Sequence, residues 1–257
     1  MRISKKSMKN RLFFLIFLSI NLFADENLAQ KLIKAYPNFL KEYSNDQIIW
    51  NDDTKMIFDE KKEYKSYEDR LNNASLKEQL TTKYIKVKEN KNYIPNFNED
   101  AGRARFEPFF QKMYGKTQKE VEKNLVKIKW LPKSQNKTLA VTKINDVDKK
   151  LEAISNELEN LPLDLKKYVL NPSGVYNYRK ISRTNRLSVH SFGIAIDINL
   201  DFSNYWQWDE KDGKIEYKNK IPLEIVEIFE KYGFIWGGRW YHFDTMHFEY
   251  RPELLVD

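Results

Sequence analysis

A strictly alternating run over residues 194–199 is the feature that most constrains the fold of this chain. Isoleucine occupies every second position, and alanine, aspartate and asparagine fall between the isoleucines. Because successive side chains of a strand point to opposite faces, the run predicts a β-strand with one face on the core and a small, polar opposite face. Asp197 lies on that polar face. Its carboxylate needs a cation nearby, because an unpaired buried charge is costly.

A second strand with the same alternation is predicted over residues 246–250, with His247 and Glu249 on the face opposite its apolar residues. If this strand lies beside the first, His190, Asp197 and His247 converge on one point. Two imidazoles and one carboxylate, with a fourth position left for water, are typical of a catalytic zinc site. A zinc ion lowers the pKa of a water molecule toward neutrality and polarises the carbonyl group under attack.

Hydrolysis at such a site also requires a base within hydrogen-bond reach of the attacking water. Asp244, three residues before His247, is the candidate. Arg179 is a candidate to stabilise a developing oxyanion or to bind a substrate carboxylate through two hydrogen bonds. Arg183 and Arg186 lie close enough in the sequence to take this role instead.

The numbers of cysteine and histidine residues limit the kinds of catalytic or metal site that the chain can form. The chain has no cysteine, which excludes a disulfide framework, a thiolate zinc site and a cysteine nucleophile. Its three histidines are His190, His242 and His247. A histidine taken alone is more often a surface or hydrogen-bonded core residue than a metal ligand, and His242 competes for the third ligand position.

The rest of the C-terminal part mixes strands and helices. We expect further strands over 126–130, 175–179 and 234–236, a helix over 144–161 and another from Pro222 to Gly233. These elements follow no regular β-α-β order. The sequence therefore predicts an α+β fold with an antiparallel sheet.

The part of the chain over residues 25–124 is different in character. Its pattern predicts short helices separated by polar loops, and it offers no cluster of catalytic residue types. Thr117 and Glu120 match a capping box, in which a hydroxyl and a carboxylate bind the free amide groups at a helix start. Gly115 is expected to end the preceding helix. We expect this region to support the domain over 125–257 or to position its substrate.

The first 24 residues have the pattern of a signal peptide. Five basic residues precede an apolar run over 12–23, which is too short to span a bilayer. These five cations account for most of the net charge of +7, so the charge does not indicate a nucleic-acid partner. We expect export to the periplasm or cell envelope without stable membrane insertion after cleavage, with an uncleaved anchor as the alternative. Nothing in the sequence indicates an oligomeric state.

The pattern SxHxxGxAxD over residues 188–197 is followed about fifty residues later by DxxH over 244–247. Taken together, these motifs resemble the M15 family of metallopeptidases. Flanking segments over 176–179 and 233–238 are similar to the family as well. The family comprises D-Ala-D-Ala carboxypeptidases, D-Ala-D-Ala dipeptidases and L-alanyl-D-glutamate endopeptidases that act on peptidoglycan stem peptides. Its fold is shared with the hedgehog signalling domain.

The resemblance implies a cofactor, Zn²⁺, and a role for each matching residue. These roles are zinc ligand for His190, Asp197 and His247, catalytic base for Asp244, contact to the substrate or transition state for Arg179, and substrate-binding hydroxyl for Ser188. The resemblance also implies a hedgehog/DD-peptidase-like fold, in which helices flank a central antiparallel sheet, here preceded by a mainly helical N-terminal region.

The base position helps to choose among the activities in the family. Carboxypeptidases and dipeptidases of the family typically have glutamate as base, followed by a tryptophan before the last ligand. This chain has Asp244-Thr-Met-His247, which is more similar to the L-alanyl-D-glutamate endopeptidases. The expected activity is hydrolysis of a peptide bond in peptidoglycan stem peptides, by an endopeptidase or by a D-Ala-D-Ala carboxypeptidase. The alternative is a non-catalytic, zinc-stabilised module that binds the cell wall.

Overall fold

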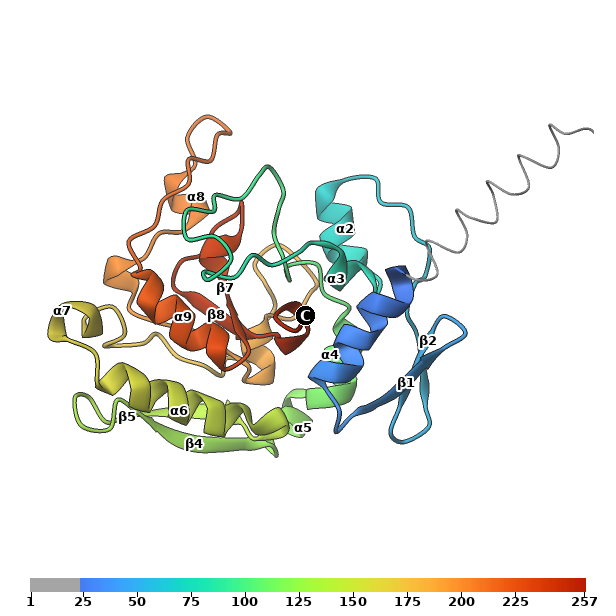
Figure 1. Cartoon of the computed structure of the whole chain (residues 1–257), viewed down its shortest axis with the longest axis horizontal. Helices are drawn as coiled ribbons and strands as arrows, with labels where there is room; N and C mark the ends of the chain where they lie inside the picture. Colours follow the sequence, from blue (N-terminus) through green and yellow to red (C-terminus); the bar gives the residue numbers. More distant parts are fainter. Residues whose placement is uncertain (1–23) are drawn as a thin grey trace, which may run out of the picture.

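A computed structural model describes residues 24–257 of the chain (Figure 1). The predicted signal peptide, residues 1–24, lies outside the described residues except for its last position. Within the described range, no helix combines the length and apolarity that a membrane span requires. Helices and small antiparallel sheets are mixed throughout, as the predicted α+β class requires.

A three-stranded antiparallel sheet forms the centre of the C-terminal part. Its strands are β6 (Ala195–Asp197), β7 (Phe234–Trp236) and β8 (His247–Tyr250), in the order β6-β8-β7. Asp197 is paired directly with His247 in the register of β6 and β8. The alternation predicted from the sequence is present, because Ile194, Ile196 and Ile198 are fully buried.

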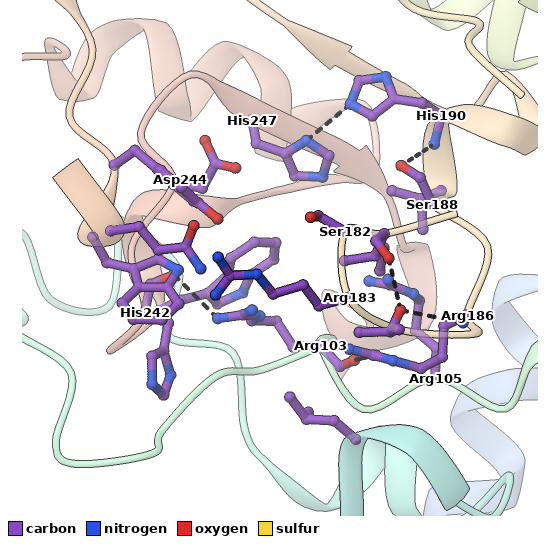
Figure 2. Close-up of a pocket in the computed structure, with 18 of the residues that line it drawn as sticks. Arg103, Arg105, Ser182, Arg183, Arg186, Ser188, His190, His242, Asp244 and His247 are labelled. Carbon is purple, nitrogen blue, oxygen red and sulfur yellow. Dashed lines mark hydrogen bonds between the residues drawn. The ribbon is translucent and has the colours of Figure 1, made fainter. Parts of the chain in front are cut away.

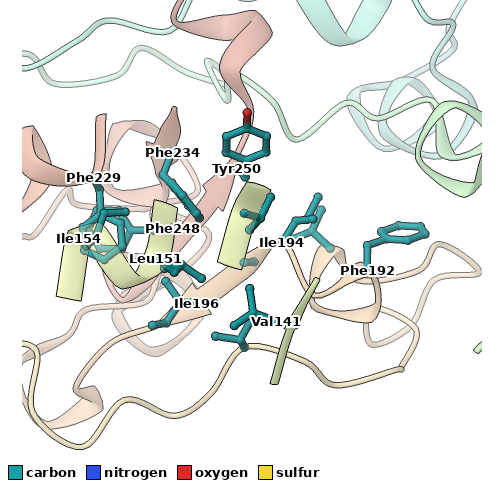
Figure 3. Close-up of a cluster of buried hydrophobic side chains, with 14 of the residues drawn as sticks. Val141, Leu151, Ile154, Phe192, Ile194, Ile196, Phe229, Phe234, Phe248 and Tyr250 are labelled. Atoms are coloured by element: carbon teal, nitrogen blue, oxygen red, sulfur yellow. The ribbon is translucent and has the colours of Figure 1, made fainter. Parts of the chain in front are cut away.

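Two amphipathic helices complete the core beside this sheet (Figure 3). Helix α9 (Leu223–Lys231) packs on β7, and α6 (Val147–Glu159) packs on α9 and on the hairpin of β4 (Leu125–Trp130) and β5 (Lys137–Thr142). The rings of Phe229 in α9 and Phe248 in β8 stack with their centroids 3.9 Å apart. These apolar contacts fix β8, and with it one side of the site.

The N-terminal part contains helices and a small sheet. Residues 24–35 are helical, and they precede an antiparallel sheet in the order β1-β2-β3. The bounds are β1 (Leu40–Ser44), β2 (Gln47–Trp50), β3 (Lys55–Ile57), α2 (Tyr67–Asn73), α3 (Glu78–Thr81), α4 (Glu107–Tyr114) and α5 (Gln118–Glu122). The predicted capping box of Thr117 and Glu120 begins α5, and Gly115, with φ 129°, ends α4.

The sheet of β1, β2 and β3 was not predicted from the sequence. Its turn is made by Asn45 and Asp46, both with positive φ (51° and 59°), a conformation that suits a two-residue hairpin turn. Neither short strand shows a clear period of two, because β1 has a register shift between Leu40 and Glu42 and β2 has three consecutive apolar residues. The description of this region as mainly helical is therefore incomplete.

The predicted strand over residues 175–179 is also wrong. The segment is irregular, and only single bridges join Gly174 to Asp197 and Lys180 to Leu187. Its backbone is bound instead to the turn that carries His190: the amide of Asn177 donates to the carbonyl oxygen of His190 at 3.1 Å. The remaining short elements are α7 (Leu163–Lys166), α8 (Trp206–Asp209) and the 3-10 helices η1 (Ile144–Asp146), η2 (Val189–Phe192), η3 (Leu200–Phe202), η4 (Gly237–Arg239) and η5 (Pro252–Leu254).

One hydrophobic core includes residues of both parts of the chain, from Ala29 to Tyr250. Polar contacts between buried groups reinforce this packing. The Tyr84 hydroxyl donates to Glu230 at 2.8 Å, and the indole nitrogen of Trp240 donates to the carbonyl oxygen of Ala101 at 2.6 Å. The N-terminal part is thus packed firmly against the sheet that carries the site.

Candidate metal centre and active site

His190, Asp197 and His247 meet at one point. Nε2 of His190 lies 3.2 Å from both Nδ1 of His247 and Oδ1 of Asp197, and the last two atoms are 2.9 Å apart. His190 comes from η2, Asp197 from β6 and His247 from β8. One ligand atom from each side chain lies within 4.8 Å of the others, a spacing that can hold a metal ion.

Hydrogen bonds on the far side of each imidazole orient its lone pair toward this point. Nδ1 of His190 donates to the carbonyl oxygen of Val175 at 2.7 Å, so its Nε2 is free to accept. Nε2 of His247 donates to a carboxylate oxygen of Glu249 at 3.1 Å, which leaves Nδ1 free. Such outer hydrogen bonds are typical of histidines that bind zinc. The three donor atoms and their surroundings therefore fit a zinc ion.

A buried chain of charges supports His247 from behind. Glu249 accepts a hydrogen bond from Nη1 of Arg251 at 2.8 Å and lies 3.6 Å from Nη1 of Arg105. Arg251 also donates through Nε to Glu253 at 2.6 Å, and Glu253 accepts from the Tyr36 hydroxyl at 2.6 Å. Arg105 and Tyr36 belong to the N-terminal part, which thereby helps to orient a candidate ligand.

The electrostatics of the centre favour a cation. Burial opposes charge on His247, but hydrogen bonds to Asp197 and Glu249, together with the negative charges of Asp197 and Asp244, outweigh this effect and raise its pKa to about 10. Burial likewise opposes ionisation of Asp197, yet hydrogen bonds from His190 and His247 hold its pKa well below the usual range. The carboxylates of Asp197 and Glu249 therefore favour a positive charge at this point, either a proton on His247 or a metal ion.

Asp244, the candidate base, lies beside this centre. Its Oδ1 is buried and has no hydrogen-bond partner within residues 24–257. Burial raises its pKa to about 6, a rise that the charge of His247 opposes and that of Asp197 assists. The loop around it is tight, because a side chain at Gly237 would bring a Cβ within 2.4 Å of the Asp244 carbonyl oxygen. Glycine is therefore required at that position.

A cavity of about 590 Å³ opens in front of these residues (Figure 2). Asp244, His190 and His247 line it, together with Ser188 and Arg179. The Ser188 hydroxyl accepts a hydrogen bond from the backbone amide of His190 at 3.4 Å, so it also caps η2. Arg179 is exposed at the cavity edge and forms no ion pair within the described residues.

His242 lies apart from the three converging residues. Its Nδ1 is 2.6 Å from Oδ2 of Asp100, and its ring stacks on Tyr67 with the centroids 5.3 Å apart. The alternative left open by the sequence is resolved geometrically, since it is His247 and not His242 that joins His190 and Asp197.

Comparison with known proteins supports this description of the site. Residues 182–250 match the model of an M15 peptidase family described as D-alanyl-D-alanine carboxypeptidase. This C-terminal segment is therefore similar to M15 peptidases. The match contains both predicted motifs, which carry the three converging residues and Asp244.

Part of the chain is also similar to a curated protein. It is 44% identical over 69 residues to the peptidoglycan L-alanyl-D-glutamate endopeptidase CwlK of Bacillus subtilis (strain 168). The aligned region is 25% of this chain and 40% of that relative, so the chain spans less than half of its length. No solved structure matches the chain.

Sequence reasoning missed the part of the cavity that lies outside the M15 segment. Arg103, Arg105 and Tyr67 of the N-terminal part line the cavity together with residues of the segment. The only trace in the sequence is the run Gly-Arg-Ala-Arg over 102–105, where two arginines stand among small residues. Nothing local in that run indicates that it folds over an active site.

Proposed function

We propose that this protein is an exported zinc peptidase that hydrolyses a peptide bond in peptidoglycan stem peptides. The observation that carries the proposal is the convergence of His190, Asp197 and His247 beside Asp244, inside the segment that matches M15 peptidases. The unpartnered carboxylate oxygen of Asp244 favours an enzyme over a structural metal site, because a structural site has no use for a positioned base.

In this proposal His190, Asp197 and His247 hold the zinc ion. When bound, zinc polarises the substrate carbonyl and makes a water molecule more acidic. Asp244 accepts the proton of the attacking water on its free oxygen and then delivers it to the leaving amine. Arg179, at the cavity edge, stabilises the negative charge that develops on the carbonyl oxygen.

The choice of the peptide bond that is cleaved rests on the identity of the candidate base, Asp244, and on the similarity to CwlK. An aspartate at the position of the base is more similar to the pattern of the L-alanyl-D-glutamate endopeptidases. The relative CwlK is named for that activity. We therefore favour cleavage between L-alanine and D-glutamate, with D-Ala-D-Ala carboxypeptidase activity as the alternative that the family description offers.

Export to the periplasm or cell envelope is part of the proposal. It rests on the basic start and short apolar run of residues 1–24. A signal peptide would direct the protein to the compartment that contains peptidoglycan. Fractionation of cells that express the full chain tests this part directly, and retention in the cytoplasm would contradict it.

Mass spectrometry of purified muropeptides incubated with the mature protein, with and without a zinc chelator, tests the activity. Chelator-sensitive release of the stem beyond its first alanine is the expected result. Loss of one terminal alanine would establish the carboxypeptidase instead. Binding of cell-wall fragments by zinc-loaded protein without any cleavage would favour a non-catalytic binding module.

A further inference from the structure

Three arginines form one wall of the cavity, below the metal centre in Figure 2. We call Arg103, Arg105 and Arg186 the arginine wall. Two of them come from the N-terminal part and lie outside the segment that matches the M15 family, whereas Arg186 lies inside it. None of the three takes part in the hydrolysis proposed above.

The acidic residues near the arginine wall are already shared with other groups. Arg105 lies 3.6 Å from Glu249, but Glu249 also binds Arg251 and His247. Arg103 lies 3.9 Å from Asp100, which is also bound by His242 and by the Tyr67 hydroxyl. These carboxylates therefore compensate the positive charge of the arginine wall only in part.

Arg186 has no carboxylate partner within 4.0 Å in the described part of the chain. Its guanidinium makes a single hydrogen bond there, from Nη1 to the carbonyl oxygen of Arg103 at 3.2 Å, and its Nε is buried without an acceptor. Burial, followed by repulsion from Arg105 and Arg103, lowers its pKa to about 9. Burying a guanidinium in this position lowers the stability of the fold unless an anion completes its hydrogen bonds.

The rest of the cavity lining increases the excess of positive charge. Arg179 and Arg183 line the same cavity, and neither forms an ion pair within residues 24–257. Three acidic residues line the cavity: Asp197 is a candidate metal ligand, Asp244 lies beside the metal centre, and Glu68 is exposed and forms no ion pair with the arginines in the part of the chain that the structure describes. An anionic group of a ligand is thus the missing partner on the arginine side of the cavity.

We propose that the arginine wall is a subsite for a free carboxylate of the substrate, bound chiefly by Arg186 and next to the peptide bond that is cleaved. This subsite rests on the proposed peptidase function and makes it more specific. A guanidinium binds a carboxylate through two parallel hydrogen bonds, which fixes orientation as well as charge. Stem peptides with a free carboxylate at this position are preferred over those in which it is amidated.

Calorimetric binding to the zinc-loaded Asp244→Asn variant of the mature protein tests the subsite without turnover. The probes are L-Ala-γ-D-Glu-L-Lys and the same peptide with the D-glutamate α-carboxylate amidated. We expect the acid to bind about 10- to 100-fold more tightly, as for hydrogen bonds to a charged group. Adding Arg186→Met to the Asp244→Asn variant should remove this difference in affinity between the two peptides.

Two further variants make the test specific. Lys180→Met removes one positive charge from the same loop but from an exposed side chain outside the cavity lining, and it should leave the difference intact. Arg186→Lys keeps the charge without the planar fork and should retain only part of the difference. Thermal melting of each variant shows whether it is folded.

The subsite would be overturned if the acid bound no more tightly than the amide, or if folded Arg186→Met kept the full difference. Turnover of the acid peptide by the wild-type protein is measured separately. Absence of cleavage there would count against the proposed function, while the difference in binding would still decide the subsite.

Discussion

Asp197 and His247 face each other across two neighbouring antiparallel strands, and Oδ1 of Asp197 lies 2.9 Å from Nδ1 of His247. The register of β6 and β8 fixes this pair. A shift of one residue would turn one side chain to the buried face, where Ile196 and Phe248 now pack. The core that holds the isoleucines thus also holds the candidate ligands in place.

Replacing the candidate base tests the chemistry apart from the metal. We expect Asp244→Ala to lower kcat about 100- to 10,000-fold, because a general base typically contributes that much. Zinc content should stay near that of the wild-type protein, since the three ligand side chains remain. Steady-state kinetics and elemental analysis of the same preparation check both points. Wild-type activity in this variant would refute the assignment of the base.

The two nearby histidines provide a matched pair of variants. His247→Ala should lose both bound zinc and activity, because it removes one of three converging donors. His242→Ala should keep its zinc, because His242 is hydrogen-bonded to Asp100 and lies outside the converging group. Zinc per chain, measured after gel filtration, distinguishes the two. Full zinc occupancy in His247→Ala would contradict the ligand set.

Glu249 is expected to tune metal affinity without touching the metal. Glu249→Gln removes the negative charge that accepts a hydrogen bond from His247 and compensates Arg105 and Arg251. We expect zinc affinity to fall about 10- to 100-fold, as for other outer partners of zinc-binding histidines. Competition with a chromogenic chelator measures the affinity.

The control for this change is Glu159→Gln. Glu159 is also a buried glutamate, and it accepts hydrogen bonds from Ser134 and from the backbone of Lys133 away from the site. The Glu159→Gln substitution should leave the zinc affinity unchanged even if it lowers the stability of the protein. An equal loss of affinity in both variants would indicate a general effect on folding.

Removal of the N-terminal part should abolish the fold rather than trim an accessory region. Deleting residues 25–124 removes Tyr36, Tyr84 and Arg105, whose buried partners in the C-terminal part would lose their hydrogen bonds or counter-charge. Each such loss costs about 1–3 kcal/mol, and many apolar contacts of the shared core are lost with them. Circular dichroism and a thermal melt of the deletion variant provide the measurement. Full activity on small muropeptides would show that this part only docks or assists.

Local patterns in the sequence were sufficient for several elements. The alternation of isoleucines located β6, the spacing of leucines and isoleucines located α6, and the Thr117–Glu120 box located the start of α5. Each of these signals depends on neighbours a few residues apart. The predicted strand over 175–179 failed because its backbone bonds to the turn that carries His190, which no local pattern reveals.

The sequence by itself identified His190 and Asp197 as candidate ligands, left His247 and His242 as alternatives for the third, and marked Asp244 as the candidate base. Strand periodicity sets which face each side chain occupies, and the two motifs supply donor atoms of the right kind. Only the tertiary structure decided which histidine completes the set and which residues close the cavity. Arg103 and Arg105 are more than eighty residues from His190 along the chain, yet they line the same cavity. That proximity comes from packing of the N-terminal part on the shared core, a long-range contact that periodicity within a short segment does not encode.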